Sequence, residues 1–121
     1  MYLTKEDKQI AFDGFKDVKL LLSNSGNIPE ACKIALYRRI DDIFELCERN
    51  VLYKFVKREK TKLFIYIQAL YDAGFINLNL YHDIDSNLTK AIKKANEIYI
   101  KQYKEMGSKK ECNKYYKAIE I

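Results

Sequence analysis

The sequence predicts an all-α protein, an up-down four-helix bundle with a short C-terminal helical extension, in one domain spanning residues 1–121. Three observations support this fold class. Apolar residues recur three and four positions apart over long stretches, as on one face of an α-helix. Only four Gly and one Pro interrupt the chain, which favours long helices with few connections. The 48% hydrophobic content supplies one compact core, and the chain is too short for two.

The first helix is expected over about residues 5–22. Thr4 followed by Asp7 resembles a capping box at its start. The apolar positions of one helix face are Ala11, Phe15, Val18 and Leu22. The Ser-Asn-Ser-Gly-Asn run at 23–27 is turn chemistry and ends this helix.

The second helix is expected to open at Pro29 and Glu30, which supply a preset φ and a favourable charge for a first turn. Its core-facing row is Cys32, Leu36, Ile40, Ile43, Cys47 and Val51. Residues 57–62 (Lys-Arg-Glu-Lys-Thr-Lys) contain no apolar side chain. Because no core-facing row can run through them uninterrupted, the second helix is expected to end there or to project beyond the core.

The third helix is expected to resume at Leu63 and to stop at Gly74, a natural left-handed cap. Just beyond, three residues fit the N′, N-cap and N4 positions of a hydrophobic staple: Ile76, Asn77 and Tyr81. They begin the last long helix, which is expected to end at Gly107. A short amphipathic helix over residues 109–119 completes the prediction.

No combination of residues predicts catalysis, a metal site or a cofactor. His82 is the single histidine, and on a helix only Asp85 of its acidic neighbours shares its face, so a metal site would need remote ligands. Cys32 and Cys47 lie on a core-facing row, where a cysteine acts as a small apolar residue. The glycine pattern of a phosphate-binding loop is also missing from the sequence. We therefore expect a protein that is not an enzyme.

The acidic pair of the second helix has an equally simple interpretation. Asp41 and Asp42 lie three and four positions from Arg38 and Arg39. These charges are expected to pair along the helix surface rather than to act as an acid and a base.

A cytoplasmic location is expected. Three Cys residues, an odd number, show no C-x-x-C spacing and accompany no secretory leader, which favours reduced thiols. No apolar run approaches the roughly 18 to 20 residues that span a bilayer, so no role in a membrane is expected.

The net charge of +5 is concentrated toward the C-terminus, where residues 87–121 carry nine Lys/Arg against four Asp/Glu. Two basic clusters are candidates for nucleic-acid binding through phosphate contacts. The first is Lys54, Lys57, Arg58, Lys60 and Lys62, with Tyr53 and Phe55 among them as rings that either stack on bases or fill the core. The second is Lys90, Lys93, Lys94, Lys101 and Lys104. The alternative for each cluster is a solvated helix face with no partner.

The order of these features resembles a known family. The carrying residues are Ile28-Pro29, Leu36, the run Arg38-Arg39-Ile40-Asp41-Asp42, Lys62-Leu63, the run 70–77 (Leu-Tyr-Asp-Ala-Gly-Phe-Ile-Asn) and Tyr81. Together, over about residues 15–104, they resemble the four-helix-bundle family of diversity-generating retroelement accessory variability determinants and of proteins encoded in ribosomal RNA intervening sequences. The resemblance implies a basic homopentamer that binds a reverse transcriptase and its template RNA. Within it, Arg38 and Arg39 take the place of the family's basic residue and are further candidates for nucleic-acid binding.

The leading hypothesis from the sequence is thus a non-enzymatic accessory protein that binds nucleic acid (template RNA or cDNA) and a reverse transcriptase. A protein-only adaptor or inhibitor from a mobile element, docking a helix face onto an acidic protein partner, is the alternative. An enzyme with an unfamiliar site is a third, less favoured reading.

Overall fold

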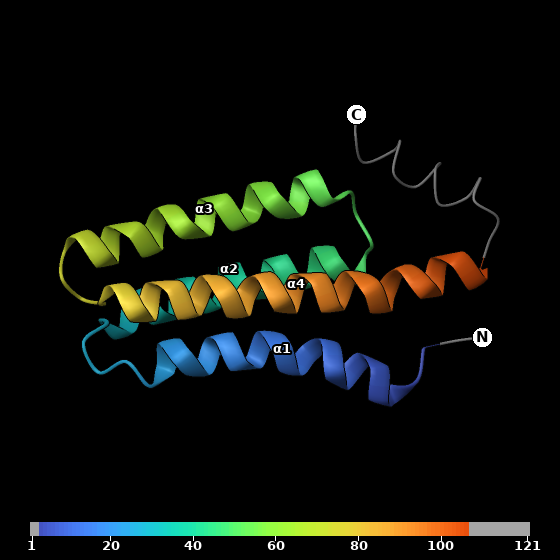
Figure 1. The fold of residues 1–121 in the computed structure, drawn as a ribbon, viewed down its shortest axis with the longest axis horizontal. Coiled ribbons are helices and arrows are strands. Elements are labelled where there is room, and N and C mark those ends of the chain that lie inside the picture. The colour runs from blue at the N-terminus through green and yellow to red at the C-terminus, as the bar shows by residue number, and fades with distance from the viewer. Residues whose placement is uncertain (1–2, 107–121) are drawn as a thin grey trace.

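Four antiparallel helices form an up-down bundle, as the sequence predicts (Figure 1). They are α1 (Lys5–Ser23), α2 (Glu30–Glu48), α3 (Tyr53–Asp72) and α4 (Leu78–Met106). This computed structural model describes the backbone of residues 3–106 and the side chains of residues 3–101. The predicted helix end at Gly107 and the predicted helix at 109–119 lie outside the described residues.

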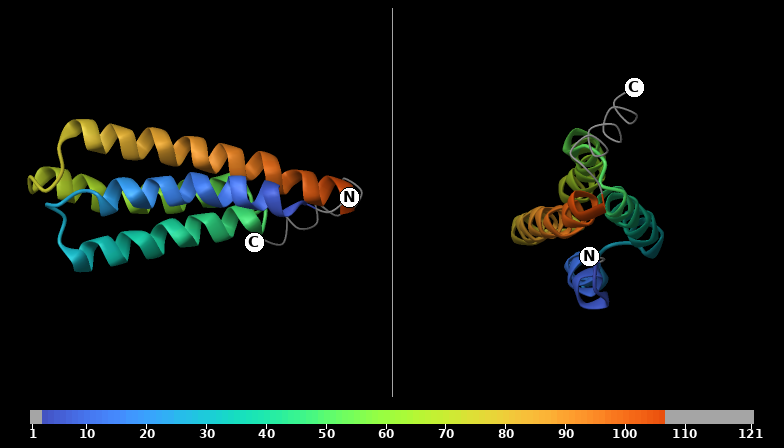
Figure 2. Two further views of the ribbon diagram at one scale, coloured as in Figure 1. Left: turned by 90° about the horizontal axis from the view of Figure 1, so that it is seen from below. Right: turned by 90° about the vertical axis from the view of Figure 1, so that its right-hand side faces the viewer.

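Seen from its end, the bundle has α1 opposite α3, with α2 and α4 on either side between them (Figure 2). The α1 and α4 helices pack closely because Gly14 has no side chain. A Cβ atom placed on Gly14 would lie 3.1 Å from the Cβ of Ala91 and 3.3 Å from its Cα. Carbon atoms in ordinary contact are about 3.5–4.0 Å apart, so this glycine sets how near α4 lies to α1.

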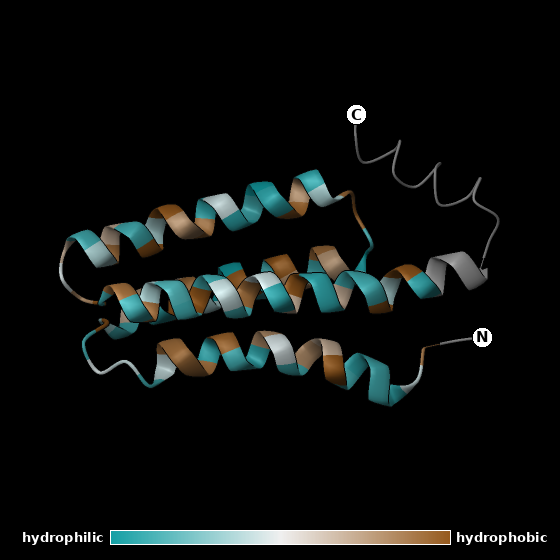
Figure 3. Ribbon diagram, viewed as in Figure 1, coloured by the Kyte–Doolittle hydropathy of each residue, from teal (hydrophilic) through white to brown (hydrophobic). Residues whose placement is uncertain are grey.

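The core draws one apolar row from each helix (Figure 3). The predicted row of the first helix is buried as expected, with Val18 and Leu22 fully covered. In α2 the row from Leu36 to Cys47 is buried too, but Cys32 is only partly covered. Cys32 still packs against the core from this partly covered position, and Lys33 beside it is buried as well.

Lys33 can be buried because its stem is apolar and its ammonium finds an acceptor. Its Nζ donates a hydrogen bond of 3.1 Å to the carbonyl of Ser23, the last residue of α1. The carbonyls of a last helical turn have no partner within the helix. The long side chain therefore covers apolar surface while its charged end links the start of α2 to the end of α1.

The boundary between the second and third helices was predicted in the wrong place. α2 ends at Glu48, and Asn50 adopts a left-handed φ of 51°. The amides of Asn50 and Val51 donate to the carbonyls of Cys47 and Leu46, at 3.0 and 3.2 Å. This is the Schellman arrangement with asparagine in the place usually taken by glycine.

The polar run 57–62 consequently lies inside α3 instead of ending α2. The core-facing positions Val56 and Leu63, both fully buried, stand seven residues apart with Lys60 between them on the same side of the helix. Lys60 can occupy that position because its ammonium reaches polar groups on α4. Lys60, paired with α4, thus occupies the core-facing position between Val56 and Leu63 where the sequence has no apolar residue.

Three helix ends that were predicted from capping residues, at Thr4, Gly74 and Asn77, are confirmed. The Oγ1 of Thr4 accepts from the amide of Asp7 at 3.1 Å, and the Oδ1 of Asn77 accepts from the amide of Leu80 at 2.8 Å. Gly74 has a φ of 82° and ends α3. Among the described residues, none of the helices combines the length and apolar character needed to cross a membrane.

Candidate nucleic-acid interface

Two basic segments that are distant in sequence lie side by side on the α3/α4 edge of the bundle. Residues 53–62, in the first half of α3, carry five basic residues and one acidic residue; residues 85–101 of α4 carry four and two. Together these segments have a net charge of +6, whereas the whole chain has +5. The excess positive charge of the protein is therefore concentrated on this edge, and Figure 3 draws the first half of α3 mainly as hydrophilic.

A groove separates these two segments. It consists of two adjoining hollows of about 380 and 370 Å³, which share Tyr53 and Lys60. The first hollow is also lined by Lys57, Thr61, Phe64, Ile65, Tyr81 and Asp85. The second is also lined by Thr89, Ile92, Lys93, Asn96 and Glu97. We call this feature the α3/α4 groove.

Aromatic rings join α3 to α4 at the end of the α3/α4 groove nearer Gly74, where Phe64 and Tyr81 line the first hollow. The ring centroid of Tyr81 lies 5.7 Å from that of Phe64 and 6.1 Å from that of Tyr71. Rings at these separations are in packing contact. The α3/α4 groove is therefore framed by apolar packing near Gly74 and by charged and polar residues along the first half of α3.

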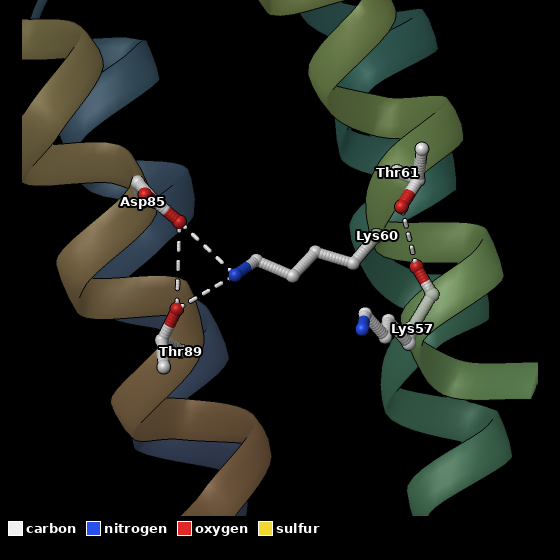
Figure 4. Close-up of polar contacts among 5 residues, drawn as sticks. All are labelled: Lys57, Lys60, Thr61, Asp85 and Thr89. Atoms are coloured by element: carbon white, nitrogen blue, oxygen red, sulfur yellow. Dashed lines mark hydrogen bonds and ion pairs between the residues drawn. The ribbon is translucent and has the colours of Figure 1, made fainter. Parts of the chain in front are cut away.

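Lys60 bridges the α3/α4 groove (Figure 4). Its Nζ lies 3.0 Å from the Oδ1 of Asp85 and donates to the Oγ1 of Thr89 at 2.8 Å. The Thr89 hydroxyl in turn lies 3.4 Å from the same carboxylate oxygen. A lysine ammonium has three protons, and two of them are used here. Lys60 was predicted as a phosphate-binding residue; in the structure it holds α3 to α4.

Lys57 and Lys93 are the exposed cations of the α3/α4 groove. Figure 4 shows the side chain of Lys57 extending toward the gap between the helices, one turn from Lys60. Lys93 contributes from α4. The two therefore place positive charge on opposite walls.

The remaining cations of the first cluster lie outside this groove. The Nζ of Lys54 and the Cζ of Arg58 lie 5.4 and 5.3 Å from the ring centroid of Phe55. Lys62 forms an ion pair of 3.2 Å with Glu59 on its own helix. Phe55 itself packs against the core, whereas Tyr53 is 58% exposed. Of the two rings noted in the sequence, only Tyr53 is thus available for stacking.

The α4 lysines extend the basic surface outward. Lys90, Lys94 and Lys101 are exposed, and their spacings of four and seven place them along one stripe. Lys93 connects this stripe to the α3/α4 groove, being three residues from Lys90. The side chain of Lys104 lies outside the described side chains.

Arg39 belongs to a different surface, between α2 and α3, and Arg38 beside it is exposed on α2. The Cζ of Arg39 lies 4.3 Å from the ring centroid of Tyr66, and its Nη2 donates to the Tyr66 hydroxyl at 3.0 Å. Asp41 forms an ion pair with Lys19 of α1. The contacts of Arg39 and Asp41 therefore run between helices, rather than along α2 as predicted.

An apolar groove that the sequence reasoning missed lies between α2 and α3. It has a volume of about 450 Å³ and is lined by Ala31, Cys32, Ala35, Leu36, Arg39, Tyr66, Ala69, Leu70, Ala73 and Phe75. The available signal was a pair of alanines four residues apart on each helix, which leaves a channel where larger side chains would meet. We call it the α2/α3 groove.

Among the described residues, the side chains that could bind a metal or act as a nucleophile are scattered or packed against other groups. Within the part of the chain that the structure describes, no cluster of three or more His, Cys, Asp or Glu could hold a metal ion. His82 is exposed against the ring of Tyr81, with 5.7 Å between centroids. Burial, with a smaller contribution from the charge of Glu48, raises the pKa of the Cys47 thiol to about 12. That thiol is neutral at physiological pH.

The carboxyl of Glu48, the last residue of α2, also has a shifted pKa. Burial raises the pKa of its carboxyl above the ordinary value, the nearby charge of Glu45 raises it further, and Lys8 lowers it. The pKa of the Tyr99 hydroxyl is raised as well, first by burial and then by the charges of Glu48 and Cys47. These groups lie away from the α3/α4 groove.

No family model, curated protein or solved structure matches this chain. The family resemblance seen in the sequence therefore stays a prediction.

Proposed function

We propose that this protein is a non-enzymatic accessory protein that binds nucleic acid through the α3/α4 edge. The observation that carries the proposal is the meeting of two basic segments at one groove, with exposed Lys57 and Lys93 on opposite walls. A phosphate backbone presents regularly spaced negative charges, and each lysine that meets one releases a condensed counterion. Such binding requires a concentrated positive surface and no catalytic group.

The salt dependence gives a quantitative test. If Lys57, Lys90, Lys93 and Lys94 each neutralise one phosphate, the logarithm of the affinity falls with the logarithm of salt concentration with a slope of about −3 on a single strand. Fluorescence anisotropy with a labelled oligonucleotide of mixed sequence measures this slope. A slope near zero, or no binding at low salt, contradicts the proposal.

A matched pair of charge reversals tests the surface itself. Lys57→Glu with Lys93→Glu is expected to weaken binding at least about tenfold, because two contacts become repulsive. Lys5→Glu with Lys16→Glu changes the net charge equally, but on exposed positions of α1 across the bundle. Circular dichroism verifies that both variants keep their helices. Equal losses in the two variants would show that no particular surface is used.

A four-lysine reversal tests the α4 stripe. Lys90→Glu, Lys94→Glu, Lys101→Glu and Lys104→Glu together are expected to abolish binding while helicity is retained. Binding that survives these changes removes the stripe from the proposal.

The resemblance adds two further elements to the proposal: the protein partner is a reverse transcriptase, and the assembly is a homopentamer. A cytoplasmic location, which the odd number of cysteines in the sequence favours, is also part of the proposal. Light scattering at five times the 14.3 kDa of one chain is the expected result for the pentamer. Co-purification with a reverse transcriptase encoded nearby tests the partner, and a monomer that binds no such enzyme contradicts both.

The α2/α3 groove favours a second candidate function, a protein-only adaptor or inhibitor. The occupant that fits is an amphipathic helix of a partner protein with an acidic residue beside its apolar face, because the groove is apolar with the guanidinium of Arg39 on its lining. Ala35→Arg would block such a helix. Co-purification that survives nuclease treatment, is lost in Ala35→Arg and persists in the Lys57/Lys93 reversal supports this candidate over nucleic-acid binding.

A further inference from the structure

We propose that the α3/α4 groove selects single-stranded nucleic acid over duplex, with a base stacked on Tyr53 and the flanking phosphates on Lys57 and Lys93. This inference rests on the proposed function and specifies its ligand.

The position of Tyr53 carries the argument. Its side chain is 58% exposed although it belongs to the first turn of α3, and it lines both hollows of the groove. The ring therefore stands where the two hollows meet. Every base has a flat π-face, so an exposed ring between cations binds successive bases without sequence preference.

The charges around the ring are arranged to hold a backbone that passes over it. Lys57 follows Tyr53 by one turn on α3, and Lys93 lies on the α4 wall of the hollow that Tyr53 also lines. Of the two carboxylates in the α3/α4 groove, Asp85 is neutralised by Lys60 at 3.0 Å, and Glu97 lines the second hollow beside Lys93. Thr61 and Asn96 add neutral polar groups that can meet base edges.

The size of the α3/α4 groove favours one strand. Each hollow of about 380 or 370 Å³ falls in the range of small-ligand pockets, roughly 300–1,000 Å³. Unstacked bases can enter such spaces. A duplex keeps its bases paired inside and offers this edge only phosphates. A single strand therefore gains the stacking contribution, roughly a fivefold to hundredfold increase in affinity per base, which a duplex does not.

The test compares four ligands with the full chain. Single-stranded RNA and single-stranded DNA of one mixed sequence, and the two corresponding duplexes, are titrated at equal salt by fluorescence anisotropy. We expect single strands to bind at least about tenfold more tightly than duplexes. If only one of the two single strands exceeds its duplex, the inference holds for that nucleic acid alone.

Substitution of the ring separates stacking from charge. Tyr53→Leu is expected to lower single-strand affinity at least fivefold and to leave duplex affinity unchanged within twofold, whereas Tyr53→Trp retains the preference. Tyr66→Leu is the matched control, since Tyr66 is 49% exposed on the same helix but lines the α2/α3 groove. Circular dichroism verifies the helicity of each variant.

The outcomes distinguish this inference from the proposed function. Equal affinity for single strands and duplexes, or no effect of Tyr53→Leu, overturns the stacking inference; loss of binding in the Lys57/Lys93 reversal then still supports a basic nucleic-acid interface. Absence of binding to all four ligands overturns both.

Discussion

The close approach of α1 and α4 predicts that Gly14→Val destabilises the bundle. Even the Cβ of this valine would lie 3.1 Å from the Cβ of Ala91, and its two methyl groups add further volume. Phe15, Val18 and Leu88 are at most 2% exposed, so these core side chains cannot move into solvent to make room. Overpacking of this kind costs about 1–3 kcal/mol. Valine is a better helix former than glycine by only about 0.5 kcal/mol, so the expected net loss is about 1–2 kcal/mol.

Urea unfolding followed by circular dichroism measures the loss, which corresponds to a fall in melting temperature of roughly 4–10 °C. Gly26→Val is the control, because no atom lies within 4 Å of a Cβ placed there. Adding Ala91→Gly to Gly14→Val should recover stability through a coupling of at least about 1 kcal/mol, since it removes the opposing methyl group. Unchanged stability in Gly14→Val, or two effects that simply add, would refute the argument from close packing.

Three further predictions concern polar and thiol groups. Lys60→Met should lower the free energy of unfolding by about 1 kcal/mol, because the bridge between α3 and α4 is lost. Lys62→Met removes an ion pair within α3 and should change the free energy of unfolding by less than about 0.5 kcal/mol. Urea unfolding measures both variants, and equal effects would contradict the bridging role of Lys60. The pKa of Glu48 is raised in the fold, so its stability contribution is greatest at low pH and is lost as pH rises from the unfolded pKa through the folded one. Glu48→Gln should therefore stabilise the protein at pH 7, by a small amount because Glu48 is exposed and water screens its charge. At pH 3 the variant and the unmodified protein should be equally stable, and a constant difference across pH would refute this. With a pKa of about 12, only about one Cys47 thiol in 10⁴ is ionised at pH 8. A thiol reagent should therefore label Cys47 at least about 100-fold more slowly than the half-buried Cys32. Mass spectrometry of the native protein measures both rates, and comparable rates would count against the burial of Cys47.

The sequence predicted the fold well where local chemistry decides it. The caps at Thr4, Gly74 and Asn77 depend on side chains within a few residues of a helix end, and all three are confirmed. The apolar rows of α1 and α2 followed from their spacing. Local reasoning failed at Asn50, because asparagine enters the left-handed region less often than glycine and gave no strong signal.

The candidate site was harder to predict because its residues come from two helices. The sequence placed the basic residues along each helix, but it could not show that Lys60 would meet Asp85 and Thr89 of another helix. The polar run 57–62 was predicted to end a helix because the contact of Lys60 with α4 could not be seen from the sequence. The separation of Arg39 from the α3/α4 groove, through its contact with Tyr66, likewise depends on how neighbouring helices face one another.

The bundle is held unequally on its two sides. Between α1 and α4 a glycine lets the two helices pack closely, whereas between α3 and α4 the side chain of Lys60 crosses an open groove. Sub-global opening follows the weaker seam, so amide hydrogens in the first half of α3 should exchange with deuterium before those in the middle of α1. The edge that carries the positive charge is then also the edge that opens more easily, and a ligand bound there should slow amide exchange in the first half of α3.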